Sequence, residues 1–301
     1  MVFVFGLLVL LAIGVFIPAK PGRQNMLYTQ TDKDKLLINT PSPRIIFVGG
    51  SNLAYGLDSK RIKDSLHLNP INTGIHVNLG LKFMLTNTLQ YIKPGDIIIL
   101  AAEYQQFYGN LANGEGELLS IVTDIAPQSQ RLLDYKQVFT LIKLLPEYAQ
   151  SKLRPVMMFY KYPKDNGIGR YDRAAFNIYG DATAHWKMPG ENTKPYPAIT
   201  GKLNNDAVDA LLNFKNAIKL KKAKLYVTFP GYQKSSFQKS AAAIAQVEQV
   251  LKNNHFNLIS TPQEFELPDD LIFDTPYHLT KRGVDYRTGL LIRDLKKVIK
   301  R

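Results

Sequence analysis

The sequence contains no cysteine among its 301 residues and only one tryptophan. Without cysteine the chain cannot form a disulfide, bind zinc or an iron–sulfur cluster through thiolates, or use a thiol nucleophile. Acidic residues are also outnumbered, with 25 Asp and Glu against 38 Lys and Arg, which gives a formal net charge of +13. That charge suits nucleic acid, an anionic membrane or an acidic glycan, so it does not by itself identify a partner.

Several ligand-binding motifs are absent as well. The sequence has no G-x-x-x-x-G-K-[ST] pattern, which argues against a P-loop, and no helix-turn-helix, zinc-finger or RNP-like motif, which argues against nucleic acid. No cluster of His, Asp and Glu has metal-ligand spacing, so we expect no metal and no other cofactor. With 45% hydrophobic residues, the chain is suited to fold around a large core.

The N-terminal segment is an apolar run. Residues 2–18 read VFVFGLLVLLAIGVFIP, without a charge, which is close to the shortest length that spans a membrane. We expect residues 1–19 to form a transmembrane anchor; a cleaved signal and a buried helix of a soluble protein are the alternatives. Residues 20–43 are polar and predict a stalk beside the membrane.

From residue 44 onward, short apolar segments alternate with helical patterns. Strands are predicted at 44–49, 76–79, 96–101, 223–229 and 256–260, and helices at 57–66, 82–92, 206–220, 238–253 and 281–300. This alternation predicts an α/β fold over residues 44–301, a three-layer α/β/α sandwich with a mainly parallel five-stranded sheet. Residues from about 110 to 205 interrupt the rhythm and predict a long insertion, with helical pattern at 130–144.

Two segments carry the chemistry that we expect at the carboxyl edge of this sheet. Gly49-Gly50-Ser51-Asn52 follows the first strand, and such a small-residue turn can expose a serine beside free backbone N–H groups. Asp274 and His278 lie on one loop before the last helix. A serine nucleophile needs a base and an orienting carboxylate, and these two residues can supply both. A plain strand–helix turn and a surface loop are the alternatives.

These blocks resemble the SGNH (GDSL-like) hydrolase superfamily. The similarity covers roughly residues 44–108 and 223–300, and it is greatest to membrane-anchored members that work beside membrane-bound O-acyltransferases, as in teichoic acid D-alanylation and alginate acetylation. The resemblance implies a Ser51–His278–Asp274 triad. It also implies an oxyanion hole near Asn52 and Gly80, which belongs to the Asn78-Leu79-Gly80 block.

The third block of the superfamily is G-x-N-D, whose Asn donates to the oxyanion. Here the third strand ends instead in Ala-Ala-Glu103-Tyr104-Gln105-Gln106. We therefore place Glu103, Tyr104 and Gln106 among the candidate oxyanion or substrate-binding residues. In the insertion, Tyr179, Asp181 and His185 lie near the only tryptophan, and this mixture of aromatic and polar groups suits a carbohydrate ring. A loop folded over the core is the alternative for that segment.

The sequence thus predicts an extracytoplasmic serine acyltransferase of the cell envelope. Its expected reaction is O-acetyl transfer to a surface polysaccharide, anionic or neutral, with a membrane-bound O-acyltransferase and the membrane as partners. An esterase that deacylates glycans or lipids, and a non-catalytic glycan-binding or assembly partner, are the alternatives. Lys20 and Arg23 after the apolar run favour a cytoplasmic domain by the positive-inside rule, so topology and chemistry conflict unless Met1 is an internal start.

Overall fold

The computed structural model describes residues 6, 9, 13–17, 25–157 and 168–299. At its centre lies a parallel sheet with strand order β2-β1-β3-β4. The strands are β1 (Arg44–Gly49), β2 (Asn69–Asn72), β3 (Ile97–Ala101) and β4 (Lys224–Val227). The α/β class and the parallel sheet predicted from the sequence are therefore confirmed.

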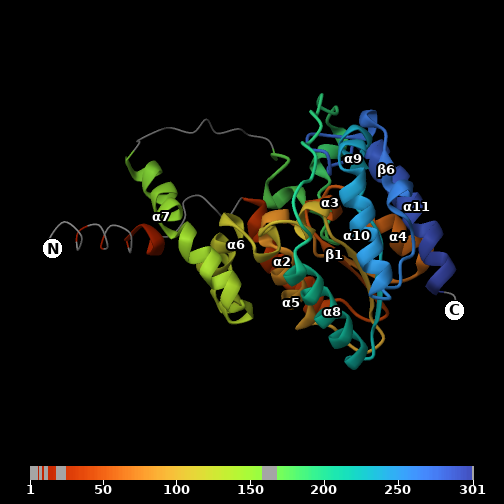
Figure 1. Ribbon diagram of the computed structural model, residues 1–301, viewed down its shortest axis with the longest axis horizontal. Helices are drawn as coiled ribbons and strands as arrows, with labels where there is room; N and C mark the ends of the chain where they lie inside the picture. Colours follow the sequence, from red (N-terminus) through yellow and green to blue (C-terminus); the bar gives the residue numbers. More distant parts are fainter. Residues whose placement is uncertain (1–5, 7–8, 10–12, 18–24, 158–167, 300–301) are drawn as a thin grey trace.

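Helices pack against both faces of the sheet (Figure 1). Successive strand residues point to opposite faces. Ile46 of β1 therefore packs with α5 (Leu81–Leu89), α8 (Asn205–Leu220) and α10 (Ala241–Asn253). Its neighbour Ile45 packs with α4 (Ser59–Leu66) and α11 (Lys281–Ile299). Because both faces are buried, the inner strands contain few polar residues.

The predicted number of strands is wrong, because the sheet has four strands and not five. Segment 256–260 adds only one bridge, between Leu258 and Val227. The backbone N–H of Leu258 bonds to the carbonyl of Phe256, so this segment turns before a ladder can form. A separate two-stranded parallel sheet pairs β5 (Tyr232–Gln233) with β6 (Glu266–Leu267).

The second strand also lies earlier than predicted. Residues 76–79 do not extend; Val77–Leu79 is a 3-10 helix, and the His76 side chain accepts a hydrogen bond from the N–H of Asn78. The strand is instead Asn69–Asn72, whose Pro70 has no backbone N–H to donate. An edge strand tolerates this loss, and β2 is at the edge of the sheet.

Most of the apolar run at 2–18 lies outside the described residues. Within the described part, no helix combines the length and the apolar character needed to cross a membrane. Part of the predicted stalk forms α2 (Thr29–Asn39) and packs on the folded body. Its buried Lys33 donates to the carbonyls of Asn72 and Gly180, at 2.8 and 2.7 Å, so α2 is fixed to the domain.

The insertion lies between β3 and β4, where the sequence predicted it. It contains α6 (Gly116–Ser120), a π-helical turn (Ile121–Ile125) and α7 (Tyr135–Met157), which projects from the body (Figure 1). The remaining helices are α3 (Ser51–Ala54), directly after β1, and α9 (Lys234–Lys239), directly before α10.

Candidate active site at the carboxyl edge of the sheet

Ser51 is the first residue of α3, two residues after the end of β1. A close backbone contact requires the first of the two preceding glycines, whereas the second faces the end of the Glu103 side chain. A Cβ atom on Gly49 would lie 2.4 Å from the carbonyl oxygen of Ala101, and one on Gly50 would lie 2.6 Å from Oε1 of Glu103. The tight turn therefore brings Ser51 against the carboxyl end of β3, where it is 7% exposed.

Asp274 and His278 are hydrogen-bonded to each other, with 2.8 Å between Asp274 Oδ1 and His278 Nδ1. Their loop is closed by a bridge between Ile272 and Leu279 and by a hydrogen bond from the N–H of Phe273 to the carbonyl of His278. Both side chains are nearly buried, at 5% and 6% exposure. The structure thus brings together the two residues that the sequence offered as candidate base and orienting carboxylate.

Two residues of the insertion hold the other oxygen of Asp274. The Tyr171 hydroxyl donates to Oδ2 at 2.6 Å, and the Arg170 guanidinium lies 3.2 Å from the same atom. Burial alone would raise the pKa of Asp274, but its bond to His278, the Tyr171 hydroxyl and the Arg170 charge together lower it. Asp274 is thus held as a carboxylate that fixes the orientation of the imidazole. Neither Tyr171 nor Arg170 was predicted from the sequence to have this role.

Tyr55 connects the turn that contains Ser51 to the loop that contains Asp274 and His278. Its N–H donates to the carbonyl of Ser51 at 2.9 Å, and its carbonyl accepts from the N–H of Leu279 at 3.2 Å. Its ring stacks on the His278 imidazole with 4.2 Å between centroids. Residues more than 200 positions apart in the chain are therefore placed side by side. The only sequence signal for Tyr55 was its place four residues after Ser51.

Glu103 is the direct partner of the Ser51 hydroxyl, which donates to Glu103 Oε1 over 3.3 Å. The same oxygen accepts from the backbone N–H of Asn52 at 3.1 Å. Among the described contacts no hydrogen bond links Ser51 to His278. The residue in contact with the serine is thus Glu103, which lies in the segment where the SGNH superfamily has its donating Asn. An ionised carboxylate only accepts hydrogen bonds, so Glu103 cannot replace that donor.

Arg287 of α11 is buried behind this turn. It donates to the backbone carbonyl of Asn52 and, at 3.0 Å, to the Asn52 side-chain oxygen. Burial lowers the pKa of Arg287 to about 9, and the negative charge of Glu103 opposes that shift. Arg287 is only 1% exposed, although it belongs to a helix with many lysines and arginines.

Most of the predicted oxyanion donors already have protein partners, although the buried Tyr104 hydroxyl has none among the described residues. The Asn52 amide donates to the Ala101 carbonyl at 3.0 Å, and the N–H of Gly80 donates to Val77 within its own turn. The N–H of Tyr104 donates to the Tyr277 hydroxyl, and the Gln106 amide donates to the carbonyl of Val77. These four residues therefore hold the surrounding loops together in the structure described.

Of the three candidates from the insertion, Tyr179 and Asp181 lie at α4, and only His185 lies near the Asp274–His278 loop. The buried Asp181 accepts from the N–H and the hydroxyl of Ser59, at 2.8 and 2.7 Å, and so anchors the start of α4. Tyr179 lies beside Lys63 of the same helix. His185 does reach the site, where its Nε2 is 3.0 Å from the Leu279 carbonyl and its ring is 5.2 Å from that of Tyr55.

A cavity of about 520 Å³ opens beside Glu103. Tyr277, the neighbour of His278, lines one side of it, and Tyr196 packs edge-on to Tyr277 with 6.3 Å between ring centroids. The rest of its wall comes from Val77 and, after β3, from Gln105, residues 108–111, Glu115 and residues 196–200. The aromatic residues of this wall are Tyr108, Tyr196 and Tyr277, whereas the sequence candidates Tyr179, Asp181 and His185 do not line the cavity.

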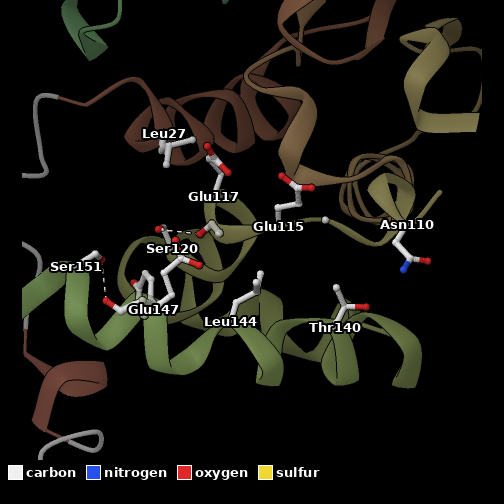
Figure 2. Close-up of a pocket in the computed structure, with 12 residues that line it drawn as sticks. Leu27, Asn110, Glu115, Glu117, Ser120, Thr140, Leu144, Glu147 and Ser151 are labelled. Carbon is white, nitrogen blue, oxygen red and sulfur yellow. Dashed lines mark hydrogen bonds between the residues drawn. The ribbon is translucent and has the colours of Figure 1, made fainter. Parts of the chain in front are cut away.

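A larger hollow of about 690 Å³ lies between α6 and α7 (Figure 2). Glu115, Glu117 and Glu147 line it together with serine and threonine hydroxyls, as the figure shows. None of the described residues that line it is a histidine, lysine or arginine. It therefore holds no histidine to pair with its serine hydroxyls, whereas the Ser51 edge has a serine near an Asp–His pair and is the better candidate for serine chemistry.

Comparisons of the chain with protein-family models, with curated proteins and with solved structures found no match.

Proposed function

We propose that this protein is a membrane-anchored serine acyltransferase of the SGNH type that acts outside the cytoplasm. The observation that carries the proposal is the buried Asp274–His278 pair. Tyr55 connects this pair to the Ser51 turn, because its ring stacks on His278 and its N–H bonds to the Ser51 carbonyl. A nucleophile candidate, a base and an orienting carboxylate are three of the four parts that acyl transfer needs.

The reaction proceeds in two steps. The Ser51 hydroxyl attacks the acyl carbonyl of a donor, His278 takes its proton and returns it to the leaving group, and an acyl-Ser51 ester forms. A sugar hydroxyl then attacks this ester, His278 takes the proton of that hydroxyl, and Ser51 is regenerated with the proton. The first step requires the Ser51 hydroxyl to leave Glu103 and to reach hydrogen-bond distance of His278.

The cavity beside Glu103 is the proposed acceptor site. Its volume is within the usual range for small-ligand pockets, and the tyrosine rings at its wall suit the apolar face of a sugar. In this proposal the acceptor is a cell-surface polysaccharide, and the acyl group, acetyl, comes from a membrane-bound O-acyltransferase.

The test is labelling of Ser51. A fluorophosphonate probe and an activated acetyl ester are each incubated with the purified chain, and the modified residue is identified by mass spectrometry. We expect an adduct on Ser51 that disappears in Ser51→Ala. Ser151→Ala, which alters an exposed serine of α7, is the matched control and keeps full labelling.

A second function, non-catalytic glycan binding, is favoured by one observation. Ser51 donates to Glu103, whose carboxylate offers no donor to an oxyanion. This second function is supported if Ser51 remains unlabelled while the protein still binds a surface polysaccharide. The esterase alternative is supported if acyl-Ser51 forms and is hydrolysed by water as fast as it is transferred to a glycan.

A further inference from the structure

Helix α7 exposes an apolar stripe along its first half. Tyr135, Val138, Phe139 and Ile142 are 77%, 43%, 62% and 55% exposed. Their spacing of three and four residues places them on one face of the helix. Leu141, at 4% exposure, points away from this stripe and belongs to the core of the domain. The helix therefore buries one side on the body and leaves a second apolar side uncovered.

The described part of the N-terminal run packs on the same side of α7. A Cβ atom on Gly14 would lie 2.7 Å from Cβ of Ala149, so the two backbones are in close contact there. Lys152 Nζ also donates to the carbonyl of Val15 at 2.8 Å. Ile142 and Ala149 are seven residues apart, about two helical turns, and therefore lie on one line of the helix.

The N-terminal turn adds its own exposed side chains, because Ile13 and Phe16 are 45% and 83% exposed. Figure 1 shows this turn beside α7, away from the central sheet. The exposed stripe is therefore continuous with the apolar run of the chain. That run carries no charge from residue 2 to residue 18, as a segment in a lipid interior requires.

A cation borders the stripe. Lys143 Nζ lies 4.2 Å from the centroid of the Phe139 ring. Aromatic and aliphatic side chains flanked by lysine are the composition of helices that lie in a membrane interface, with the apolar side in the acyl region and the ammonium among the phosphates. The net charge of +13 also favours an anionic surface.

We propose that α7 lies on an anionic lipid bilayer through Tyr135, Val138, Phe139 and Ile142, as a second membrane contact beside the N-terminal run. This contact is independent of the chemistry at Ser51. Together with the N-terminal run it gives the domain a broader contact with the bilayer, which restricts tilting about a single anchor.

The absence of cysteine makes the test direct, since one introduced cysteine is the only labelling site. The full chain carries an environment-sensitive fluorophore at Phe139→Cys, at Phe16→Cys as the anchor reference, or at Leu220→Cys as the control. Leu220 is 84% exposed at the end of α8. Each protein is mixed with phosphatidylcholine–phosphatidylglycerol vesicles that contain a spin-labelled lipid as quencher.

We expect lipid quenching at positions 139 and 16, and none at position 220. Adding Lys143→Glu to the Phe139→Cys protein is expected to weaken its quenching. The proposal is overturned if position 139 stays unquenched, whether or not position 16 is quenched. It is also overturned if shielding at position 139 depends on protein concentration without vesicles, since a second copy would then cover the stripe.

Discussion

The carboxylate of Glu103 should slow the acylation of Ser51, and Glu103→Gln tests this directly. The carboxylate oxygen is 3.3 Å from the Ser51 hydroxyl, and an oxyanion formed on the attacked carbonyl would lie about 5 Å from it. Two negative charges at that distance repel by about 3 kcal/mol at an effective dielectric constant of about 20. The buried positive charge of Arg287 offsets part of this energy.

If Arg287 cancels about half of the repulsion, the carboxylate raises the barrier by about 1.5 kcal/mol, which is about a tenfold lower rate. Glutamine has nearly the same shape, and its carbonyl oxygen still accepts from the N–H of Asn52. We therefore expect Glu103→Gln to react about tenfold faster with a fluorophosphonate probe. The assay follows the rate of Ser51 labelling on the fully folded protein, as verified by circular dichroism.

Glu103→Ala is the companion variant. It also removes the charge, but it leaves the Asn52 N–H without its acceptor, so any gain in rate should be smaller than in Glu103→Gln. A tenfold slower reaction of Glu103→Gln would refute the electrostatic reasoning. In that case Glu103 would act as a base or a positioning group for Ser51.

Three further predictions follow from the buried polar contacts. Asp274→Asn should lower Ser51 labelling by about 10²–10⁴-fold, because the imidazole loses its orienting charge, whereas Tyr171→Phe, which removes one neutral donor, should lower it by tenfold or less. Asp96→Ala should cost about 3–5 kcal/mol in urea unfolding, because it leaves the fully buried Arg44 unpaired. Burial lowers the pKa of His185 to about 4, so the folded protein binds fewer protons than the unfolded chain between pH 6.5 and 4. Stability should therefore fall by about 2 kcal/mol from pH 6.5 to 5, and His185→Phe should remove most of this loss.

Each of these predictions has an outcome that contradicts it. Equal labelling rates in Asp274→Asn and Tyr171→Phe would show that the Asp274 charge does not orient His278. A loss below 1 kcal/mol in Asp96→Ala would mean that water reaches Arg44. An unchanged pH slope in His185→Phe would assign the acid sensitivity to another group.

Local sequence patterns located several helices, because neighbouring residues carry the helical repeat, but the pattern at 130–144 covers only part of α7 and the predicted stalk contains α2. The patterns at 206–220 and 281–300 correspond to α8 and α11 within one residue at each end. The strand β2 was missed because NPIN has almost no apolar signal. Its pairing with β1 depends on a neighbour that is distant in sequence.

In the candidate site, too, contacts within one segment were predictable and contacts between distant segments were not. The pairing of Asp274 with His278 was predictable, since both lie on one short loop. Glu103 was named as a candidate, but its contact with the Ser51 hydroxyl was not foreseen. Tyr171 and Arg287 were not foreseen either, because each reaches the site from a segment more than 100 residues from Ser51.

By itself, the sequence determined the α/β class, the Gly-Gly-Ser turn, the Asp–His loop and the exclusion of thiol chemistry, because each depends on composition or on neighbouring residues. Only the tertiary structure decided the number of strands, the partner of the Ser51 hydroxyl and the uncovered side of α7. These features depend on which distant segments are in contact, and on where a close approach, such as that of Gly49 to the Ala101 carbonyl, leaves no room for another side chain.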